Sequence, residues 1–225
     1  MKTIYKSFLT GFLILPIFLT SCEKDPVQGT VTDIEGNIYK TIKIGDQWWM
    51  AENLQTGQYR NGTVIPLVTD NSAWSNLTTP GYCWYENEKS TYGLTYGALY
   101  NWYTVETGNL CPTGWHVPTV AEWIVLTNFL GGLNVAGGKL KESGTTHWTS
   151  PNVGATNKVG FKALPGGNRS INGPFGDILT HAYWWTANDY DVTRAWARSA
   201  FYNNVIIDLN YFHKRNGFTV RCVKD

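Results

Sequence analysis

The amino-acid sequence predicts a compact, β-rich domain built of short strands and tight turns. Three observations support this: the 225 residues include 24 Trp and Tyr residues (11 and 13), 23 Gly and only 2 Met. Aromatic, glycine-rich and methionine-poor chains suit strands and turns better than helical bundles. Hydrophobic residues make up 43% of the chain, which excludes wholesale disorder.

The charge composition excludes one class of partner. Lys and Arg number 18 against 17 Asp and Glu, so the formal net charge is +1. Only 16% of residues are charged, compared with about 25% in an average soluble domain. No basic field is available to bind nucleic acid electrostatically, and we expect no nucleic-acid partner.

The first 21 residues, 1–21, have the features of an export signal. Lys2 and Lys6 precede an apolar stretch, Phe8–Leu19, that is too short to span a bilayer comfortably. The segment ends in Leu-Thr-Ser followed by Cys22, which resembles the bacterial lipoprotein signal. In that family the peptide is cut before the cysteine, which then carries acyl chains and anchors the protein in a membrane. The alternative is an ordinary secretory signal with a coincidental cysteine.

Residues 22–29 are expected to form a short tether after the lipidated cysteine. Glu23 and Asp25 follow Cys22 closely and resemble the export tag that sends Bacteroidetes lipoproteins to the outer leaflet of the outer membrane. The alternative is a solvated linker without a sorting role. We therefore expect an outer-membrane lipoprotein that is exposed at the cell surface.

Residues 30–225 are expected to form a single domain, since they contain no tandem repeat and no linker rich in Pro and Ser. Residues 37–44 largely alternate apolar and polar side chains, and a Gly-Asp turn leads into 47–50, which predicts a hairpin. Residues 55–81 are rich in Gly, Asn, Thr and Pro and predict a loop. The aromatic run 82–85 predicts a short strand.

Two helices are predicted in the middle of the chain. Residues 98–105 have apolar side chains spaced for one helical face. The stronger prediction begins after Thr119, which forms a capping box with Glu122. The inward-facing stripe of this helix consists of Trp123, Leu126, Thr127 and Leu130. Two glycines then end it, and the glycine-rich stretches 131–138 and 165–167 are expected to form turns.

The last part of the chain predicts a meander of strands. The predicted strands are 183–186, 194–202, 205–211 and 218–223. Asn203 and Asn204 form a turn pair between the second and third of these strands.

Several motifs in a fixed order carry a family resemblance. The longest runs from Cys111 to Thr119 (Cys-Pro-Thr-Gly-Trp-His-Val-Pro-Thr) and leads into Glu122 and Trp123. The others are Asp33–Asn37, Trp49–Leu54, Tyr100–Trp102, Ala136–Lys141, Gly160–Gly167, Trp184–Trp185 and Val220–Val223. Together they resemble the Fibrobacter succinogenes major paralogous domain, a family of Bacteroidetes and Fibrobacter surface proteins, from about residue 30 to the end.

The segment Gly114–Trp123 also resembles the signature of sulfatase-modifying-factor domains, which belong to the C-type-lectin-like architecture. This resemblance implies an α+β, C-type-lectin-like fold of the sulfatase-modifying-factor type. Such a fold has twisted antiparallel strands, two short helices, long ordered loops and neighbouring termini.

With Cys22 assigned to the anchor, three cysteines remain, and an exported chain favours disulfides. In lectin-like folds a cysteine near the helix is tied to the last strand, so the resemblance implies a disulfide between Cys111 and Cys222. Cys83 would then be a buried thiol in an aromatic strand. The alternative pairing is Cys83 with Cys222.

The sequence does not carry the catalytic sets of the related enzymes. Formylglycine-generating relatives hold copper with two cysteines near the C-terminus, and only Cys222 lies in the last hundred residues. Iron-dependent relatives need clustered histidines, whereas this chain disperses His116, His147, His181 and His213. No P-loop or nucleophile elbow is present. We expect no catalysis, no catalytic metal, and structural roles for His116, Glu52 and Glu122.

Polar side chains of the kind that bind calcium follow the aromatic strand. Asn188, Asp189 and Asp191 provide the oxygen donors that Ca²⁺ prefers. However, the Glu-Pro-Asn and Gln-Pro-Asp loops of calcium-dependent lectins are absent. A polar hairpin turn is the favoured interpretation of this segment.

Recognition without calcium is the remaining binding mode, because exposed aromatic rings stack on sugars while neighbouring polar groups orient them. The candidate ligand-binding residues are Trp74, Trp148, Asn188, Asp189, Tyr190 and Asp191, and Tyr202 lies in a similar context. The sequence thus predicts a non-catalytic surface lipoprotein that binds a glycan or a protein. The alternatives are an accessory subunit of an outer-membrane complex and an enzyme of the sulfatase-modifying-factor type.

Overall fold

The computed structural model describes residue 1 and residues 28–225. The predicted signal segment, Cys22 and most of the predicted tether lie outside the described residues. Within the described part the architecture is mixed α+β, with antiparallel sheets and few, short helices. The fold class predicted from the sequence is confirmed at this level.

The largest sheet joins the beginning of the described chain to its end. Its strands, in spatial order, are β1 (Gln28–Thr32), β2 (Ile38–Ile44), β3 (Gln47–Met50), β12 (Val223–Lys224) and β6 (Trp115–His116). All neighbours are antiparallel, with Ile42 opposite Trp49 in the β2–β3 pair. The predicted hairpin over residues 37–50 is confirmed. Because β12 pairs with both β3 and β6, the C-terminal residues close this sheet.

A second sheet forms the meander predicted near the C-terminus. Its strands are β9 (His181–Asp189), β10 (Arg194–Phe201) and β11 (Ile207–His213), in the spatial order β11-β10-β9. The predicted fourth strand, 218–223, is wrong over most of its length. Phe218 exchanges backbone hydrogen bonds with Tyr100, whereas Thr219 lies opposite Trp184 in a parallel bridge and accepts from the Trp185 amide. This segment therefore bonds to several parts of the chain in turn rather than to one neighbouring strand.

Two small hairpins complete the sheet structure. They pair β4 (Tyr82–Cys83) with β5 (Leu99–Tyr100), and β7 (Gly166–Arg169) with β8 (Phe175–Ile178). The helix predicted over 98–105 is shorter than expected, because only α3 (Trp102–Val105) is helical. The Asn101 side chain accepts a hydrogen bond from the Thr104 amide at 3.1 Å and starts the helix there. The turn expected at 165–167 is wrong, because Gly166 and Gly167 both lie in β7.

The strongest helix prediction is confirmed. Helix α4 (Val120–Phe129) begins at the capping box of Thr119 and Glu122. The inward stripe of Trp123, Leu126, Thr127 and Leu130 is buried. Gly131 and Gly132 follow with φ angles of 97° and 98°, which only glycine adopts readily.

The turn expected over 131–138 is wrong, since helix α5 (Leu133–Leu140) occupies most of it. Its glycines serve close packing rather than a turn. A Cβ atom at Gly137 would lie 2.4 Å from the Ile206 carbonyl oxygen. Helix α5 thus lies directly against the segment that leads into β11.

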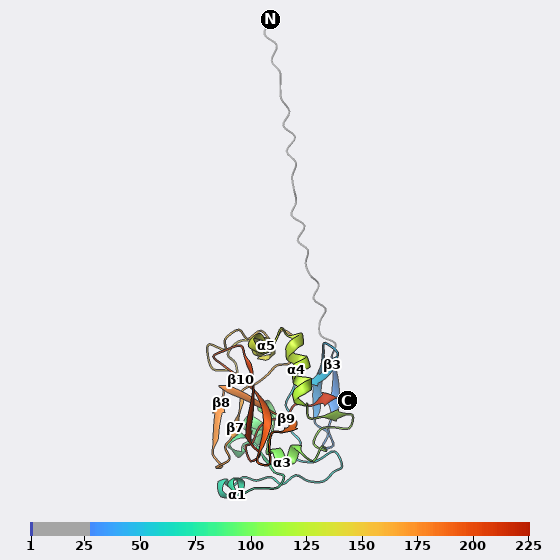
Figure 1. Cartoon of the computed structure of the whole chain (residues 1–225), viewed down its shortest axis with the longest axis vertical. Coiled ribbons are helices and arrows are strands. Elements are labelled where there is room, and N and C mark those ends of the chain that lie inside the picture. The colour runs from blue at the N-terminus through green and yellow to red at the C-terminus, as the bar shows by residue number, and fades with distance from the viewer. Residues whose placement is uncertain (2–27) are drawn as a thin grey trace.

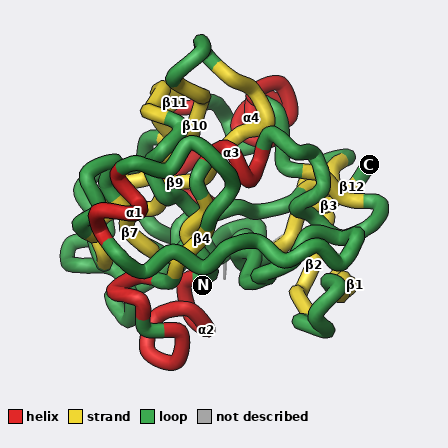
Figure 2. Tube along the Cα trace, turned by 90° about the horizontal axis from the view of Figure 1, so that it is seen from below, coloured by secondary structure: helices red, strands yellow, loops and turns green. Residues whose placement is uncertain are grey.

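The other helices are single turns. They are α1 (Asn71–Ser75), α2 (Leu94–Tyr96), a 3₁₀ turn over Tyr85–Asn87 and a π turn over Lys89–Gly93. Helix α1 interrupts the segment predicted as loop. Figure 1 shows α4 and α5 near one end of the folded part, with α1 and α3 near the other. In Figure 2, long loops run between the two larger sheets.

Three buried apolar clusters form the core. One contains Tyr100, Trp185 and Phe218, the second is centred on Trp49, Trp123 and Trp184, and a smaller one surrounds Trp74. In the second cluster the ring centroids of Trp49 and Trp123 are 5.0 Å apart. Most of the large aromatic side chains therefore stabilise the fold.

The disulfide between Cys111 and Cys222 is confirmed. Both cysteines are buried, and they precede β6 and β12, which pair with each other. Cys83 is a buried free thiol, as predicted. Burial raises the pKa of the Cys83 thiol to about 12, so this group stays protonated and unreactive.

A helix that spans a membrane must be both long and apolar. Across residues 28–225, no helix meets both requirements by itself; α4 and α5 meet them only jointly, and these two helices are bent by 82°.

Candidate functional site

The end of the second sheet exposes a group of aromatic side chains. Tyr190, in the turn between β9 and β10, and Tyr211, on β11, are each 43% exposed. Trp196 on β10 lies opposite Tyr211 in the strand register, so both side chains project from the same face. We call Tyr190, Arg194, Trp196 and Tyr211 the aromatic platform.

The rings of the aromatic platform are ordered by contacts with one another. Tyr190 and Tyr211 are stacked, with centroids 4.1 Å apart and planes at 11°. The ring of Trp196 meets both edge-on, at 5.0 Å from Tyr190 and 5.7 Å from Tyr211. Such packing holds the tyrosine side chains in place on an exposed surface. Because these side chains are already ordered, they lose little further conformational entropy when a ligand binds.

Arg194 completes the aromatic platform and is fixed by Asp191. Its guanidinium carbon lies 4.9 Å from the Tyr190 ring centroid and 4.6 Å from that of Tyr211. Its Nε donates to Asp191 Oδ2 at 2.7 Å. Asp191 Oδ1 also accepts from the amides of Thr193 and Arg194, both at 2.8 Å. The Arg194 side chain, followed by these amides, holds the pKa of the Asp191 carboxyl well below its usual range.

The four candidate residues of the turn therefore play different roles. Tyr190 belongs to the aromatic platform, and Asp189 is exposed beside it. The Asn188 side-chain oxygen accepts from the Val120 amide at 2.8 Å and so satisfies the start of α4. Asp191 is engaged by its own turn. Among the residues that the structure describes, no three His, Cys, Asp or Glu side chains are grouped to hold a metal ion.

The prediction that Trp74 faces a ligand is wrong, because this side chain is fully buried. Asp70 caps α1 through the Ala73 amide at 2.7 Å and turns Trp74 inward. The indole Nε1 donates to the Arg215 carbonyl at 2.9 Å, and the Arg169 guanidinium carbon lies 4.5 Å from the ring centroid.

The prediction for Trp148 is wrong for a similar reason. The side chain is 1% exposed, and its Nε1 donates to the Ala163 carbonyl at 2.9 Å. Its neighbour His147 is partly exposed but bonds to Glu142 at 2.7 Å. Tyr202 is partly buried against the second core cluster.

Sequence analysis missed Arg194, Trp196 and Tyr211. All three lie within predicted strands, but their proximity depends on the pairing of β10 with β11. The available signal was the alternation along these two strands, which places residues 194 and 196 on one face.

A second candidate surface is a polar depression of about 490 Å³. It is lined by Asn37, Ile38, Tyr39, Glu52, Asn53, Gln55, Leu94, Thr95, His147 and Lys162. Several of its polar groups already hold the surrounding loops. Gln55 donates to the Leu94 carbonyl, and Glu52 accepts from the Lys40 amide. We therefore favour the aromatic platform as the binding surface.

His116 is held between two carboxylates. Its Nε2 lies 2.7 Å from Glu122 Oε1, and its Nδ1 lies 2.6 Å from Asp225 Oδ1. Partial burial lowers the pKa of His116, but the bonds to Asp225 and Glu122 outweigh this effect and the pKa is raised. Since Glu122 also accepts from Thr119 in the capping box, the helix cap predicted for Glu122 is confirmed, and both ring nitrogens of His116 have partners.

This arrangement predicts a pH-dependent stability. Because the pKa of His116 is higher in the folded chain than its unfolded value of 6.5, protonation of His116 stabilises the fold. This stabilisation is complete below pH 6.5 and is lost as the pH rises through the folded-state pKa. The melting temperatures of the wild type and of His116→Gln should therefore differ most below pH 6.5 and converge as the pH is raised through the range above 6.5. A constant difference across this range would contradict the assigned charge state.

The comparisons with known proteins agree with the motifs in the sequence. The model of the Fibrobacter succinogenes major domain matches residues 42–224, a range that includes both larger sheets except β1 and the first part of β2. A search of curated proteins finds no match, and a search of solved structures finds none either. Because the match covers most of the chain, this protein belongs to the Fibrobacter succinogenes major domain family.

Proposed function

We propose that this protein is a non-catalytic carbohydrate-binding module, anchored through Cys22 in the outer membrane and displayed at the cell surface. The observation that carries the proposal is the aromatic platform. Tyrosine and tryptophan are common where a surface binds a ligand, because their rings supply large apolar faces and their polar atoms remain solvated. Here they lie at a hairpin where the rings contact one another and Arg194.

The chemistry of the aromatic platform suits a sugar. A tyrosine ring can stack on the C–H face of a pyranose, and hydroxyl groups at its rim need donors and acceptors. The tyrosine hydroxyls and the exposed Asp189 carboxylate offer both. Asp191 has little capacity left for a metal ion, since its two oxygens already accept four bonds from Thr193 and Arg194. The proposed binding therefore needs no calcium.

The absence of catalysis is also part of this proposal. Both nitrogens of His116 are engaged by carboxylates, and the thiol of Cys83 is buried and protonated. Neither group is arranged as a general base or a nucleophile that faces an open cleft. An enzyme of the sulfatase-modifying-factor type is the less favoured alternative.

We further propose that the fold is C-type-lectin-like. The first and last strands of the described chain lie in one sheet, as the neighbouring termini of that architecture require. The disulfide between Cys111 and Cys222 ties the entry to α4 to the last strand. Long ordered loops connect the short strands, and helices α4 and α5 pack against the two larger sheets.

A glycan array tests the proposed function. The wild type should bind a subset of glycans equally with and without EDTA. The double variant Tyr190→Ser/Tyr211→Ser should lose at least about tenfold in signal, because both stacking faces are removed. The matched control is Val64→Ser, since Val64 is an exposed side chain far from this sheet in the sequence (68% exposed) and should leave binding unchanged.

Other outcomes of the array would contradict the proposal in specific ways. Binding that disappears with EDTA would show that a metal ion is required. A silent array, together with a partner recovered by crosslinking on intact cells, would favour the accessory-subunit alternative.

A further inference from the structure

Five exposed apolar side chains lie on α4 and α5. They are Ile124, Val125 and Phe129 on α4, and Leu133 and Val135 on α5, each between 40% and 60% exposed. We call this set the apolar corner. Single exposed apolar residues are ordinary, but a cluster of five on two adjacent helices marks an interaction surface.

The apolar corner lies close to the point where the described chain begins. Gln28 pairs with Ile42 in the sheet, and β2 then leads to the turn at Gly45. A Cβ atom at Gly45 would lie 3.1 Å from the ring of Phe129, so this turn touches the apolar corner. Figure 1 shows β3, α4 and α5 at the same end of the folded part.

The length of the tether restricts what can face this end. Five residues, 23–27, lie between Cys22 and the start of β1 at Gln28. Fully extended, they reach at most about 20 Å. If Cys22 carries the lipid anchor, the end of the fold that contains Gln28 must remain within this distance of the membrane surface.

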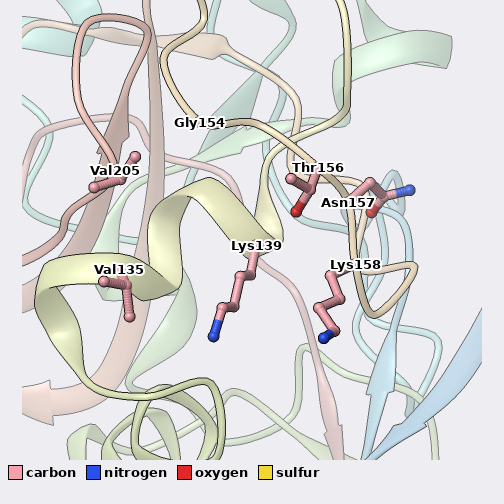
Figure 3. Close-up of a pocket in the computed structure, with 7 residues that line it drawn as sticks. All are labelled: Val135, Lys139, Gly154, Thr156, Asn157, Lys158 and Val205. Carbon is pink, nitrogen blue, oxygen red and sulfur yellow. The ribbon is translucent and has the colours of Figure 1, made fainter. Parts of the chain in front are cut away.

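The charge of the two helices in the apolar corner favours an anionic surface, and an exposed acidic residue, Asp46, lies in the adjoining turn. The sequence from Trp123 to Lys141 contains no acidic residue. Lys139 and Lys158 line a depression of about 620 Å³ that also includes Val135. In Figure 3, both ammonium ends point to the same side as the side chain of Val135. Lys139 is held there by donation to the Leu130 carbonyl at 2.6 Å.

We propose that the apolar corner lies on the lipid surface to which the tether is attached, with Lys139 against anionic headgroups. The inference rests on the lipid anchor of the proposed function. Apolar side chains at the headgroup boundary, flanked by lysines, are how interfacial helices bind a membrane. Asn188, which lies beside the aromatic platform in the chain, bonds to the first residue of α4. The apolar corner begins in the second turn of α4 and extends past the end of this helix. The aromatic platform would therefore face away from the membrane.

Hydrogen exchange on vesicles tests this orientation. The chain from Cys22 onward is linked through the Cys22 thiol to maleimide lipid in vesicles of phosphatidylcholine and phosphatidylglycerol. Cys83 is buried, and Cys111 and Cys222 form the disulfide, so none of these three cysteines should react with the maleimide. Compared with the unlinked chain, amides from 130 to 136 should exchange at least about threefold more slowly on the vesicles. Amides from 189 to 194 should be unchanged.

The control is the double variant Val125→Ser/Phe129→Ser, which changes only exposed side chains and should lose the slowing. Slowing at 189–194 instead, or no slowing at all, would overturn the proposal. Slowing that appears in concentrated chain without vesicles would also overturn it, in favour of contact between two copies. Because the chain is linked chemically, this test does not depend on acylation of Cys22 in the cell. Acylation is tested separately by the mass of the N-terminal peptide of the protein from native membranes.

Discussion

Replacing Cys111 with Ser should lower the free energy of unfolding by about 4 kcal/mol, because the disulfide with Cys222 closes a long loop in the unfolded chain. The sequence separation of the two cysteines is 111 residues. The bond also joins β6 to β12 beside the first core cluster, so its loss loosens the closure of the largest sheet. Urea unfolding of the oxidised wild type and of the variant measures the difference.

Cys83→Ser is the matched control for this prediction. It removes a buried sulfur but no crosslink, so its effect should be clearly smaller. Equal effects of the two substitutions would contradict the view that the crosslink, rather than the burial of sulfur, provides the stabilisation.

Replacing Arg169 with Met should lower the free energy of unfolding by about 3–5 kcal/mol. The guanidinium is fully buried and donates to the carbonyls of Val68, Thr69 and Gly173 and to the side chain of Asn71. Without it, the buried Gly173 carbonyl would lose its donor, and the segment that carries Trp74 would lose the bonds to Val68, Thr69 and Asn71 that anchor it. Denaturant unfolding measures the change in the free energy of unfolding. Trp74 fluorescence would report whether this indole becomes exposed when the segment loosens.

Arg198 provides the control, because it is equally buried but makes no hydrogen bond to any described residue. Burial lowers its pKa to about 10, which shows the unfavourable environment of the charge. Arg198→Met keeps a similar side-chain volume and should be neutral or stabilising. Equal destabilisation by both substitutions would contradict the role assigned to the hydrogen bonds of Arg169.

Elements with local signals were predictable from the sequence. The hairpin over 37–50 has strand alternation around a Gly-Asp turn, and α4 has a capping box and an apolar stripe. Both signals depend on residues close in the chain. Helix α5 was missed because its glycines indicate a turn locally. Their packing against Val205 and Ile206 arises only in the folded chain.

The candidate site was only partly predictable, for the same physical reason. Whether an indole in a polar segment faces solvent depends on distant partners: Trp74 is covered by Arg169, and Trp148 bonds to Ala163. The turn at Tyr190 was found from its residue types. Its stacking partner Tyr211 could be identified only once the register of β10 and β11 was known.

The central claim is that the aromatic platform binds the ligand, and calorimetric titration tests it most directly. The strongest glycan from the array is titrated into the wild type, into Tyr211→Ser, and into Gln55→Ala, which alters the polar depression. We predict that Tyr211→Ser weakens the affinity at least about tenfold, while Gln55→Ala leaves it unchanged. Unchanged affinity in Tyr211→Ser together with lost affinity in Gln55→Ala would contradict the account and place the binding site in the polar depression.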